Sequence, residues 1–447
     1  MNRALSSQLE ALFERVRAGI QLGLGPTQHV LQTLGNPEAG RHFIVVAGTN
    51  GKGSTAACLA AILTAAGYKT GLFTSPHLVH FGERIRIDGA RVQDEDIGRW
   101  LADIHAAERR AGKSLTFFEV STVMALLAFR EAATDIDVLE VGMGGRLDAT
   151  NVVPKTLSVI TAVGFDHQEY LGHTLSAIAG EKAGILQKET PAVVARQQPE
   201  AWQTIAQRGE ALGCRIVRPA RVTKAVPTHH GQWQLDLAEG TPQTFTTAMG
   251  APFLHTSIAT AVAASHQLRA LGFPISGAAL QRGVAGFRWP GRYQWLRPWG
   301  LETNAGASQP LRASEAGSAG PQVDVLLDAA HNPEAISALQ QALAQDPRAA
   351  RPYHLVTTVL EDRTDHLVAP LAQAAARVYW TPVANSRSRS VAGLEHLCAA
   401  FGGAVYANVR AALSAAQSAA AADGGFVMVT GSLYLVGACL EALGVEP

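Results

Sequence analysis

The sequence contains little cysteine and little charge of either sign. Four cysteines occur in 447 residues, and their wide spacing matches neither a metal site nor a disulfide framework. We therefore expect free thiols in a reducing compartment. Lysine plus arginine number 37, as do aspartate plus glutamate. This balance excludes a global electrostatic attraction to nucleic acid or to an anionic membrane.

Long apolar runs are also missing. No uninterrupted apolar stretch approaches the roughly 18 to 20 residues that span a bilayer, and residues 1–14 lack the hydrophobic centre of a signal peptide. These absences predict a cytoplasmic protein without a membrane partner. The chain is 47% hydrophobic and too long for one ordinary domain, so we expect two or more domains with large cores.

What the sequence does contain is a glycine-rich loop between an apolar run, 44–47, and an alanine-rich run, 56–66. A strand that leads into a helix N-terminus presents backbone N–H groups and a favourable helix dipole to an anion. Lys52 can reach the β- and γ-phosphates of a nucleotide, and Ser54 or Thr55 can hold Mg²⁺. The predicted phosphate-binding loop consists of Gly48, Thr49, Asn50, Gly51, Lys52, Gly53, Ser54 and Thr55.

The loop departs from the general P-loop pattern in two places. Val46 stands where the first glycine is usual, and Gly53 separates Lys52 from Ser54. The alternative is an ordinary glycine-rich turn between a strand and a helix. The lysine and the hydroxyls at this junction favour nucleotide binding.

Apolar runs that end in polar or glycine-rich loops alternate with helix-forming stretches. Strands are expected at 44–47, 68–73, 137–141 and 157–163, with more between 190 and 250. Helices are expected at 5–18, 94–112, 120–129 and 258–271. This alternation predicts a mostly parallel sheet, whose ligands bind at the carboxyl ends of the strands. The phosphate loop, Ser75, Glu140 and Asp166–His167 all fall at such ends.

The second half of the chain repeats a smaller α/β pattern. Residues 300–322 are rich in Gly, Ala, Ser, Glu and Pro, which is typical of a flexible insertion or linker. Strand candidates follow at 323–327, 354–359, 377–380 and 426–430. We therefore predict a P-loop ATPase-type domain at 1–299, the linker, and a Rossmann-like domain at 323–447.

Four residues are candidates for chemistry beside a triphosphate. Glu140 and His167 suggest Mg²⁺ coordination, although Mg²⁺ prefers oxygen ligands. Taken alone, Glu140 also fits a cap or salt bridge, and His167 also fits a structural histidine. His331 lies between capping residues where it could contact phosphate or substrate. Taken alone, Lys182 is typical of a surface lysine whose aliphatic stem is buried.

Seven motifs in this order resemble those of the folylpolyglutamate synthase/dihydrofolate synthase family, within the Mur-type ATP-dependent amide ligases. The resemblance extends from Leu34 to Ser432. The motifs are Gly48–Ser54, Ser75–Leu78 with Glu83–Ile85, Glu140–Asn151, Asp166–His167, Glu181–Gly184, Pro290–Arg292 and Asp328–Pro333. The Gly-Lys-Gly-Ser form of the loop is usual in this family.

The resemblance implies an enzyme that joins glutamate to dihydropteroate and to folates. In that chemistry ATP phosphorylates a carboxylate to an acyl phosphate, which the amino group of glutamate then attacks. The alternatives are a family member with a single activity or another acid acceptor, and a nucleotide-binding protein without turnover. A monomer is expected, with small molecules as its only partners.

The resemblance also implies roles for individual residues. The implied catalytic residues are Lys52, Lys182, His167 and His331. The implied nucleotide contacts beyond the loop are Ser257, Arg292, Asp328 and His331. The implied ligands of two Mg²⁺ ions are Ser54, Ser75, Glu140, His167 and a carbamylated Lys182. The implied substrate contacts are Arg84 and Ser432 for glutamate, with His331, and Thr116, Phe118 and Asp148 for the pteridine.

This chain departs from the family pattern near the adenine and in the second domain. Ser257 occupies the place of an asparagine at the start of the helix expected at 258–271, and Leu254 the place of a glutamine. Asp362-Arg363-Thr364 replaces the family's Asp-Lys-Asp. The stretch 300–322 has no family counterpart.

Overall fold

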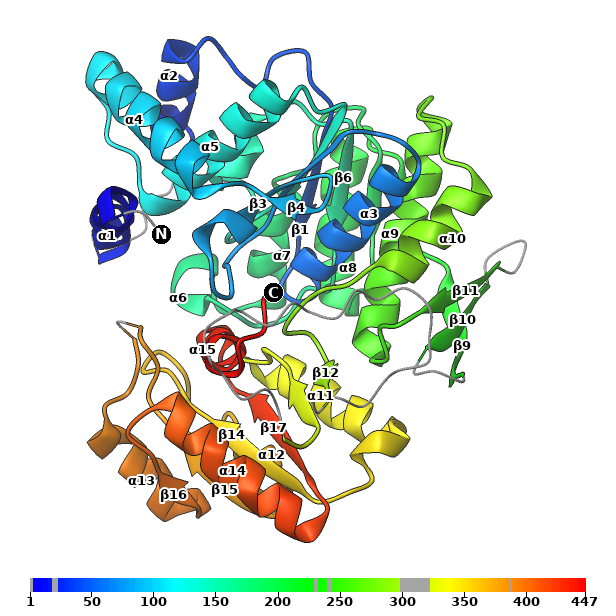
Figure 1. Ribbon diagram of the computed structural model, residues 1–447. Coiled ribbons are helices and arrows are strands. Elements are labelled where there is room, and N and C mark those ends of the chain that lie inside the picture. The colour runs from blue at the N-terminus through cyan, green and yellow to red at the C-terminus, as the bar shows by residue number, and fades with distance from the viewer. Residues whose placement is uncertain (1–2, 18–22, 229–231, 239–242, 298–321, 386) are drawn as a thin grey trace.

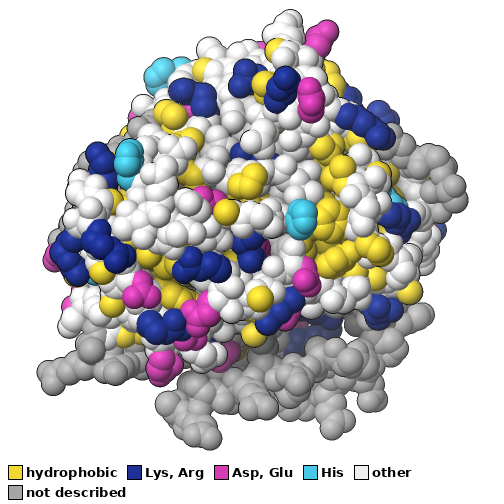
Figure 2. Space-filling model, turned by 90° about the horizontal axis from the view of Figure 1, so that it is seen from above, with side chains coloured by type: hydrophobic (Ala, Val, Ile, Leu, Met, Phe, Trp, Pro, Cys, Tyr) yellow, Lys and Arg dark blue, Asp and Glu magenta, His cyan; other side chains and the backbone are white. Residues whose placement is uncertain are grey.

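The computed structural model describes the chain except for residues 1–2, 18–22, 229–231, 239–242, 298–321 and 386. It contains a large sheet and a smaller one, each covered by helices, and a third, three-stranded sheet (Figure 1). The predicted α/β class is confirmed. Figure 2 shows one face of the molecule, on which basic and acidic side chains lie among each other. None of the described helices is long and apolar enough to cross a membrane.

The first sheet has eight strands in the order β4-β3-β2-β5-β1-β6-β7-β8, and only the pairs β2–β3 and β3–β4 are antiparallel. The strands are β1 (Phe43–Ala47), β2 (Thr70–Phe73), β3 (Ile85–Ile87), β4 (Ala90–Arg91), β5 (Ile136–Glu140), β6 (Leu157–Ile160), β7 (Ala192–Val194) and β8 (Ile216–Val217). The central strand β1 is buried throughout. Its alternate side chains enter two different cores, so both faces of the sheet are covered.

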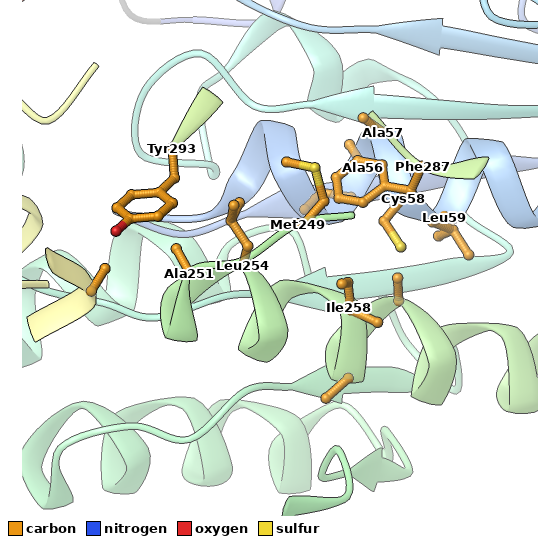
Figure 3. Packing of buried hydrophobic residues seen from close by; sticks show 14 of the residues in the cluster. Ala56, Ala57, Cys58, Leu59, Met249, Ala251, Leu254, Ile258, Phe287 and Tyr293 are labelled. Atoms are coloured by element: carbon orange, nitrogen blue, oxygen red, sulfur yellow. The ribbon is translucent and has the colours of Figure 1, made fainter. Parts of the chain in front are cut away.

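Helices from distant parts of the chain cover these two faces. One face carries α3 (Lys52–Ala65), α9 (Pro252–Ala270) and α10 (Gly277–Gly286). Figure 3 shows Ala56 and Cys58 of α3 close to Phe287, with Leu254 and Ile258 of α9 below them; the small residues allow close approach of the two helices. The other face carries α1 (Arg3–Arg17), α2 (Gly25–Thr33), α4 (Asp94–Ala111), α5 (Phe117–Ala132), α7 (Leu175–Ala183) and α8 (Pro199–Ala211).

The second sheet has six strands in the order β12-β13-β17-β14-β15-β16, with β12 antiparallel to β13. The strands are β12 (Gln294–Leu296), β13 (Val325–Leu327), β14 (Tyr353–Thr357), β15 (Arg377–Trp380), β16 (Ala404–Val405) and β17 (Phe426–Thr430). Its helices are α11 (Pro333–Gln345), α12 (Ala369–Ala374), α13 (Val391–Phe401), α14 (Val409–Asp423) and α15 (Leu433–Leu443). The antiparallel third sheet, which contacts α9 and α10, is formed by β9 (Arg221–Pro227), β10 (Trp233–Ala238) and β11 (Gln243–Thr247).

Most predicted elements recur within a few residues, and two differ. The stretch 190–250 was expected to form strands joined by loops, but it also contains α8, which begins at Pro199 and buries Ala201 and Ile205 at helical spacing. Helix α9 begins at Pro252, six residues before the expected start, so Ser257 lies inside the helix.

Residues 298–321, which lie between β12 and β13 in the sequence, are outside the described residues. Of the predicted linker, 300–322, only Gln322 is within the described residues, so its character stays a prediction. Strand β12 precedes the predicted boundary at 299 but belongs to the second sheet. The first half of the chain therefore contributes an edge strand to the second half.

Candidate active site

The phosphate loop connects β1 to α3. A Cβ on Gly48 would clash with Thr161, and Gly51 caps α3 in the left-handed conformation, at φ +86°. Helix α3 begins at Lys52, whose Nζ donates to the carbonyl of Thr49 at 3.2 Å. Since the first turn of a helix leaves N–H groups without intrahelical partners, this turn can bind an anion.

Gly53, the residue that departs from the general P-loop pattern, lies against the carboxylate of Glu140. A Cβ on Gly53 would lie 3.2 Å from Glu140 Oε2 and 3.3 Å from the ring of Trp289. That spacing is tighter than ordinary contact. The glycine between Lys52 and Ser54 therefore lets an acidic group come close to the loop.

Glu140 ends β5 and is buried. Its Oε2 accepts a hydrogen bond from the backbone of Ser75 at 3.0 Å. Burial raises its pKa, and the nearby charge of Lys52 opposes that shift. The oxygen donors near the loop suit Mg²⁺, since Glu140 supplies a carboxylate and the hydroxyl of Thr55 is buried without a hydrogen-bond partner. Within the described ranges, no three His, Cys, Asp or Glu side chains form a metal cluster.

Lys182 lies on α7 and is buried rather than exposed. Its Nζ donates to the carbonyl of Gly48 at 2.9 Å, at the start of the phosphate loop. Burial, assisted by the charge of Lys52, lowers the pKa of Lys182 to about 7. The plain interpretation of a surface lysine is therefore wrong, and much of this amine is neutral near pH 7.

Asp166 and His167 follow β6 and precede α6 (Gln168–Leu171). His167 has a left-handed backbone, at φ +51°, and burial lowers its pKa. Burial would raise the pKa of Asp166, but His167 and Arg363 outweigh it, and that pKa is about 2. Arg363 donates to Asp166 at 2.8 Å. The changed motif of the second domain thus supplies a cation that pairs across the domain boundary.

Asp328 and His331 follow β13 in the second sheet. Asp328 accepts hydrogen bonds from the backbones of Tyr293 and Ala330, and burial raises its pKa to about 6. Burial lowers the pKa of His331 to about 4, so its ring is neutral near pH 7. His331 Nδ1 lies 2.8 Å from the carbonyl of Ala329, which can only accept. The proton therefore sits on Nδ1, and Nε2 is left as an acceptor.

These groups line one cavity of about 540 Å³ between the two sheets, which we call the nucleotide cavity. All residues predicted for the phosphate loop, the metal and the nucleotide are among its lining residues, as is Ser432. Beyond the loop, these residues are Ser75, Glu140, His167, Lys182, Ser257, Arg292, Asp328, His331 and Ser432. Arg84, Thr116, Phe118 and Asp148 do not line it.

Those four residues line a neighbouring cavity of about 930 Å³, which we call the acceptor cavity. The two cavities meet beside the phosphate loop, where they share Ser75, Pro76, Gly142, Met143, His167 and Tyr434. The three residues predicted for glutamate are divided between them, because Arg84 lies in the acceptor cavity, and Ser432 and His331 in the nucleotide cavity. A group in one cavity can therefore reach a group in the other at this junction.

Two of the predicted pteridine residues already have structural hydrogen bonds. Thr116 caps α5 in a reciprocal box with Glu119. Asp148 caps the 3₁₀ helix η2 (Ala149–Val152) and accepts hydrogen bonds from Thr150 and from the backbone of Met143. Phe118 has no such bond, and a Cβ on Gly142 would overlap its ring. Of the three, Phe118 is best placed to present a face to a flat ligand.

Arg84 combines a charge with apolar surroundings in the acceptor cavity. It is buried, its guanidinium lies 4.9 Å from the ring centre of Phe117, and its Nε donates to His77 Nδ1 at 2.9 Å. Burial lowers the pKa of His77 to about 3, which keeps the ring neutral as an acceptor. Arg84, with a pKa lowered by burial to about 10, remains a cation. It can therefore bind a carboxylate.

Arg387, which no sequence motif indicates, also lines the nucleotide cavity. Its guanidinium pairs with Asp362 at 2.7 Å and lies 3.5 Å from the hydroxyl of Tyr434. No motif marks Arg387, because it stands in an irregular stretch after β15. Only the return of β17 to the centre of the sheet brings α15, with Tyr434, beside it.

Comparisons with known proteins agree with this geometry. The model of the Mur ligase middle domain matches residues 46–267, and that of the Mur ligase glutamate ligase domain matches residues 312–433. A dihydrofolate synthase/folylpolyglutamate synthase of Escherichia coli is 34% identical over 98% of this chain and 94% of its own. A folylpolyglutamate synthase of Lacticaseibacillus casei is 31% identical over 93% and 92%.

Solved structures resemble the whole chain as well. Mycobacterium tuberculosis folylpolyglutamate synthase, complexed with ADP and AMPPCP, has a TM-score of 0.85 at 30% identity over 99% of both chains. E. coli FolC in complex with DHPP and ADP has a TM-score of 0.80 at 32% identity, again over 99% of both chains. The resemblance of the motifs is thereby confirmed, and the chain belongs to the dihydrofolate synthase/folylpolyglutamate synthase family of Mur-type, ATP-dependent ligases.

Proposed function

We propose that this protein uses ATP to join glutamate to dihydropteroate and to folyl-glutamates, as a bifunctional ligase. The observation that supports this most directly is the junction of the two cavities at Ser75 and His167, beside the phosphate loop. A carboxylate that projects from the acceptor cavity would meet there the terminal phosphate of ATP held by the loop. E. coli FolC, with DHPP and ADP bound, supports the same pairing of ligands.

The reaction needs two transfers at this junction. A carboxylate oxygen of the acceptor attacks the γ-phosphorus, the bond to ADP breaks, and an acyl phosphate forms. The amine of glutamate then attacks the acyl carbon, phosphate leaves, and the amine loses a proton. We assign Lys52, together with the first turn of α3, to bind the phosphates and the charge that develops on them.

Mg²⁺ fits the oxygen donors beside the loop. We assign Glu140 and Ser54, with the unpartnered hydroxyl of Thr55 beside them, to one ion, and Ser75, Glu140 and His167 to the surroundings of a second. Bound there, Mg²⁺ would neutralise charge on the phosphates. We further propose that Lys182 is carbamylated. Its buried amine with a lowered pKa is the neutral form that reacts with CO₂, and a carbamate would supply the oxygen that Mg²⁺ prefers.

The side of the nucleotide cavity formed by the second sheet is the proposed glutamate site. Ser432 and Arg387 lie there, and Arg387 forms a half-exposed ion pair with Asp362 that a substrate carboxylate can replace at small cost. We assign the free Nε2 of neutral His331 to accept a proton from the attacking amine. Arg292 and Asp328 are assigned to ATP.

The test is a reaction of the purified full chain with ATP, Mg²⁺ and glutamate, given either dihydropteroate or tetrahydrofolate. We expect ADP with both acceptors and a product heavier by one glutamyl residue. ADP with one acceptor alone would show a single activity, and ATP binding without ADP formation would favour a protein without turnover. The monomeric state and the cytoplasmic location stay predictions.

A further inference from the structure

Glu334, on α11, is a lining residue of the nucleotide cavity to which neither the motifs nor the mechanism gives a role. It follows Pro333 in the first turn of the helix. Its Oε1 accepts one long hydrogen bond, 3.3 Å, from the backbone of Phe165. Its Oε2 is buried with no hydrogen-bond partner, and no ion pair joins Glu334 to another described residue. A carboxylate left so poorly satisfied is stabilised by any donor brought to it.

The part of the nucleotide cavity that α9 and α11 line offers a nucleoside side-chain acceptors but few side-chain donors. The hydroxyls of three residues on α9 point their protons into their own helix: Thr256 donates to Pro252, Ser257 to Phe253 and Thr260 to Thr256. The cavity residues Ala335 and Ala338 on α11 have no polar side-chain atom. This part of the cavity is therefore suited to a ligand that brings hydrogen-bond donors of its own.

The chemistry of ATP limits what a carboxylate can bind. The phosphate oxygens only accept hydrogen bonds, and their charge repels a carboxylate. The donors that remain are the ribose hydroxyls and the amino group of adenine. We propose that Glu334 is a specificity-determining residue that accepts a hydrogen bond from one of these nucleoside donors. This inference rests on the proposed binding of ATP in the nucleotide cavity.

A purely structural role for Glu334 has to be separated from this one. An acidic residue in the first turn stabilises a helix, and the bond to Phe165 joins the two domains. Glu200 provides a matched control, because it follows Pro199 in the first turn of α8 and its Oε1 accepts a hydrogen bond from the backbone of Ser176 at 3.0 Å. Glu200 does not line the nucleotide cavity.

The experiment measures nucleotide dissociation constants by calorimetry on the full chain, without acceptor or glutamate. The wild type, Glu334→Gln, Glu334→Ala and Glu200→Gln are each titrated with ATP, 2′-deoxy-ATP, 3′-deoxy-ATP and ITP. We expect the wild type to bind ATP about tenfold or more tightly than the analogue that lacks the contacted donor. Glu334→Ala loses this ratio, Glu334→Gln, which keeps one neutral acceptor oxygen, reduces it, and Glu200→Gln leaves it unchanged. The analogue affected identifies the ribose hydroxyl or the amino group.

Two results would overturn the inference and leave ATP binding intact. One is a wild type that binds all four nucleotides equally. The other is a uniform loss of affinity in the Glu334 variants, which would show that the residue acts through the fold alone. Failure of the wild type to bind ATP at all would overturn the proposed function together with this inference, and so is distinguishable from both.

Discussion

Lys182 offers the sharpest test of the proposed active site. Its Nζ is buried at the start of the phosphate loop, 2.9 Å from the carbonyl of Gly48, and no acidic group forms an ion pair with it in the described part of the chain. If its function depends on a carbamate, replacing it with alanine removes the proposed oxygen ligand and leaves space. A small carboxylic acid can then occupy that space.

The neutral fraction of the Lys182 amine, and its effect on stability, follow from the pKa of about 7. Roughly half of the amine is neutral at pH 7, about a thousandfold more than for a free lysine. The unfolded chain holds more protons than the folded chain between about pH 7 and the ordinary value of 10.5, so the stability of the uncarbamylated protein rises with pH across that window. The gain is at most about 5 kcal/mol.

We therefore expect Lys182→Ala to lower kcat by about 100-fold, the scale for groups that support a metal. Added acetate should restore part of the rate, whereas Lys182→Arg should not respond, because the guanidinium fills the space. The assay is ADP release at fixed Mg²⁺, with and without bicarbonate. Intact mass spectrometry of the wild type should show one added CO₂. Full activity of Lys182→Ala, or a rate in the wild type that is indifferent to bicarbonate, would refute the reasoning.

Three further predictions concern the nucleotide cavity. Gly53→Ala should raise KM for ATP about tenfold, because a methyl group at this position would crowd the carboxylate of Glu140; an unchanged KM for ATP would contradict this. Arg387→Gln should raise KM for glutamate about tenfold or more and leave KM for ATP unchanged. The control variant is Arg348→Gln, because Arg348 lines neither cavity. The rate should fall with decreasing pH through the region of the His331 pKa, about 4, as Nε2 becomes protonated; in His331→Gln that limb of the pH profile should disappear.

Much of the fold and the membership of the nucleotide cavity could be predicted from the sequence. The phosphate loop and Asp166–His167 follow strands of the first sheet, and Glu140 is the last residue of another; the topology of parallel strands brings those ends together. The burial of Lys182 could not be predicted. It depends on how α7 packs behind Gly48, a contact between residues 134 positions apart.

Site residues that belong to no motif could not be predicted either, because their positions also depend on contacts between distant parts of the chain. Arg387 stands in an irregular stretch, and only the strand order of the second sheet places it beside Tyr434. Thr116 and Asp148 illustrate the opposite case. Their resemblance to pteridine residues is clear in the sequence, and the structure shows that both also cap helices. A capping residue can also contact a ligand, so substitutions there will change stability and affinity together.

The contacts across the domain boundary explain why the nucleotide cavity depends on both sheets. The amide of Asn332 donates to that of Asn50 in the phosphate loop at 3.0 Å, and Arg363 pairs with Asp166. Asn332 also caps α11, the helix that carries Glu334. A shift of the loop would strain these contacts at the start of α11, and a shift of α11 would strain them at the loop. Since ATP is proposed to touch both, its binding and the position of the second domain are coupled.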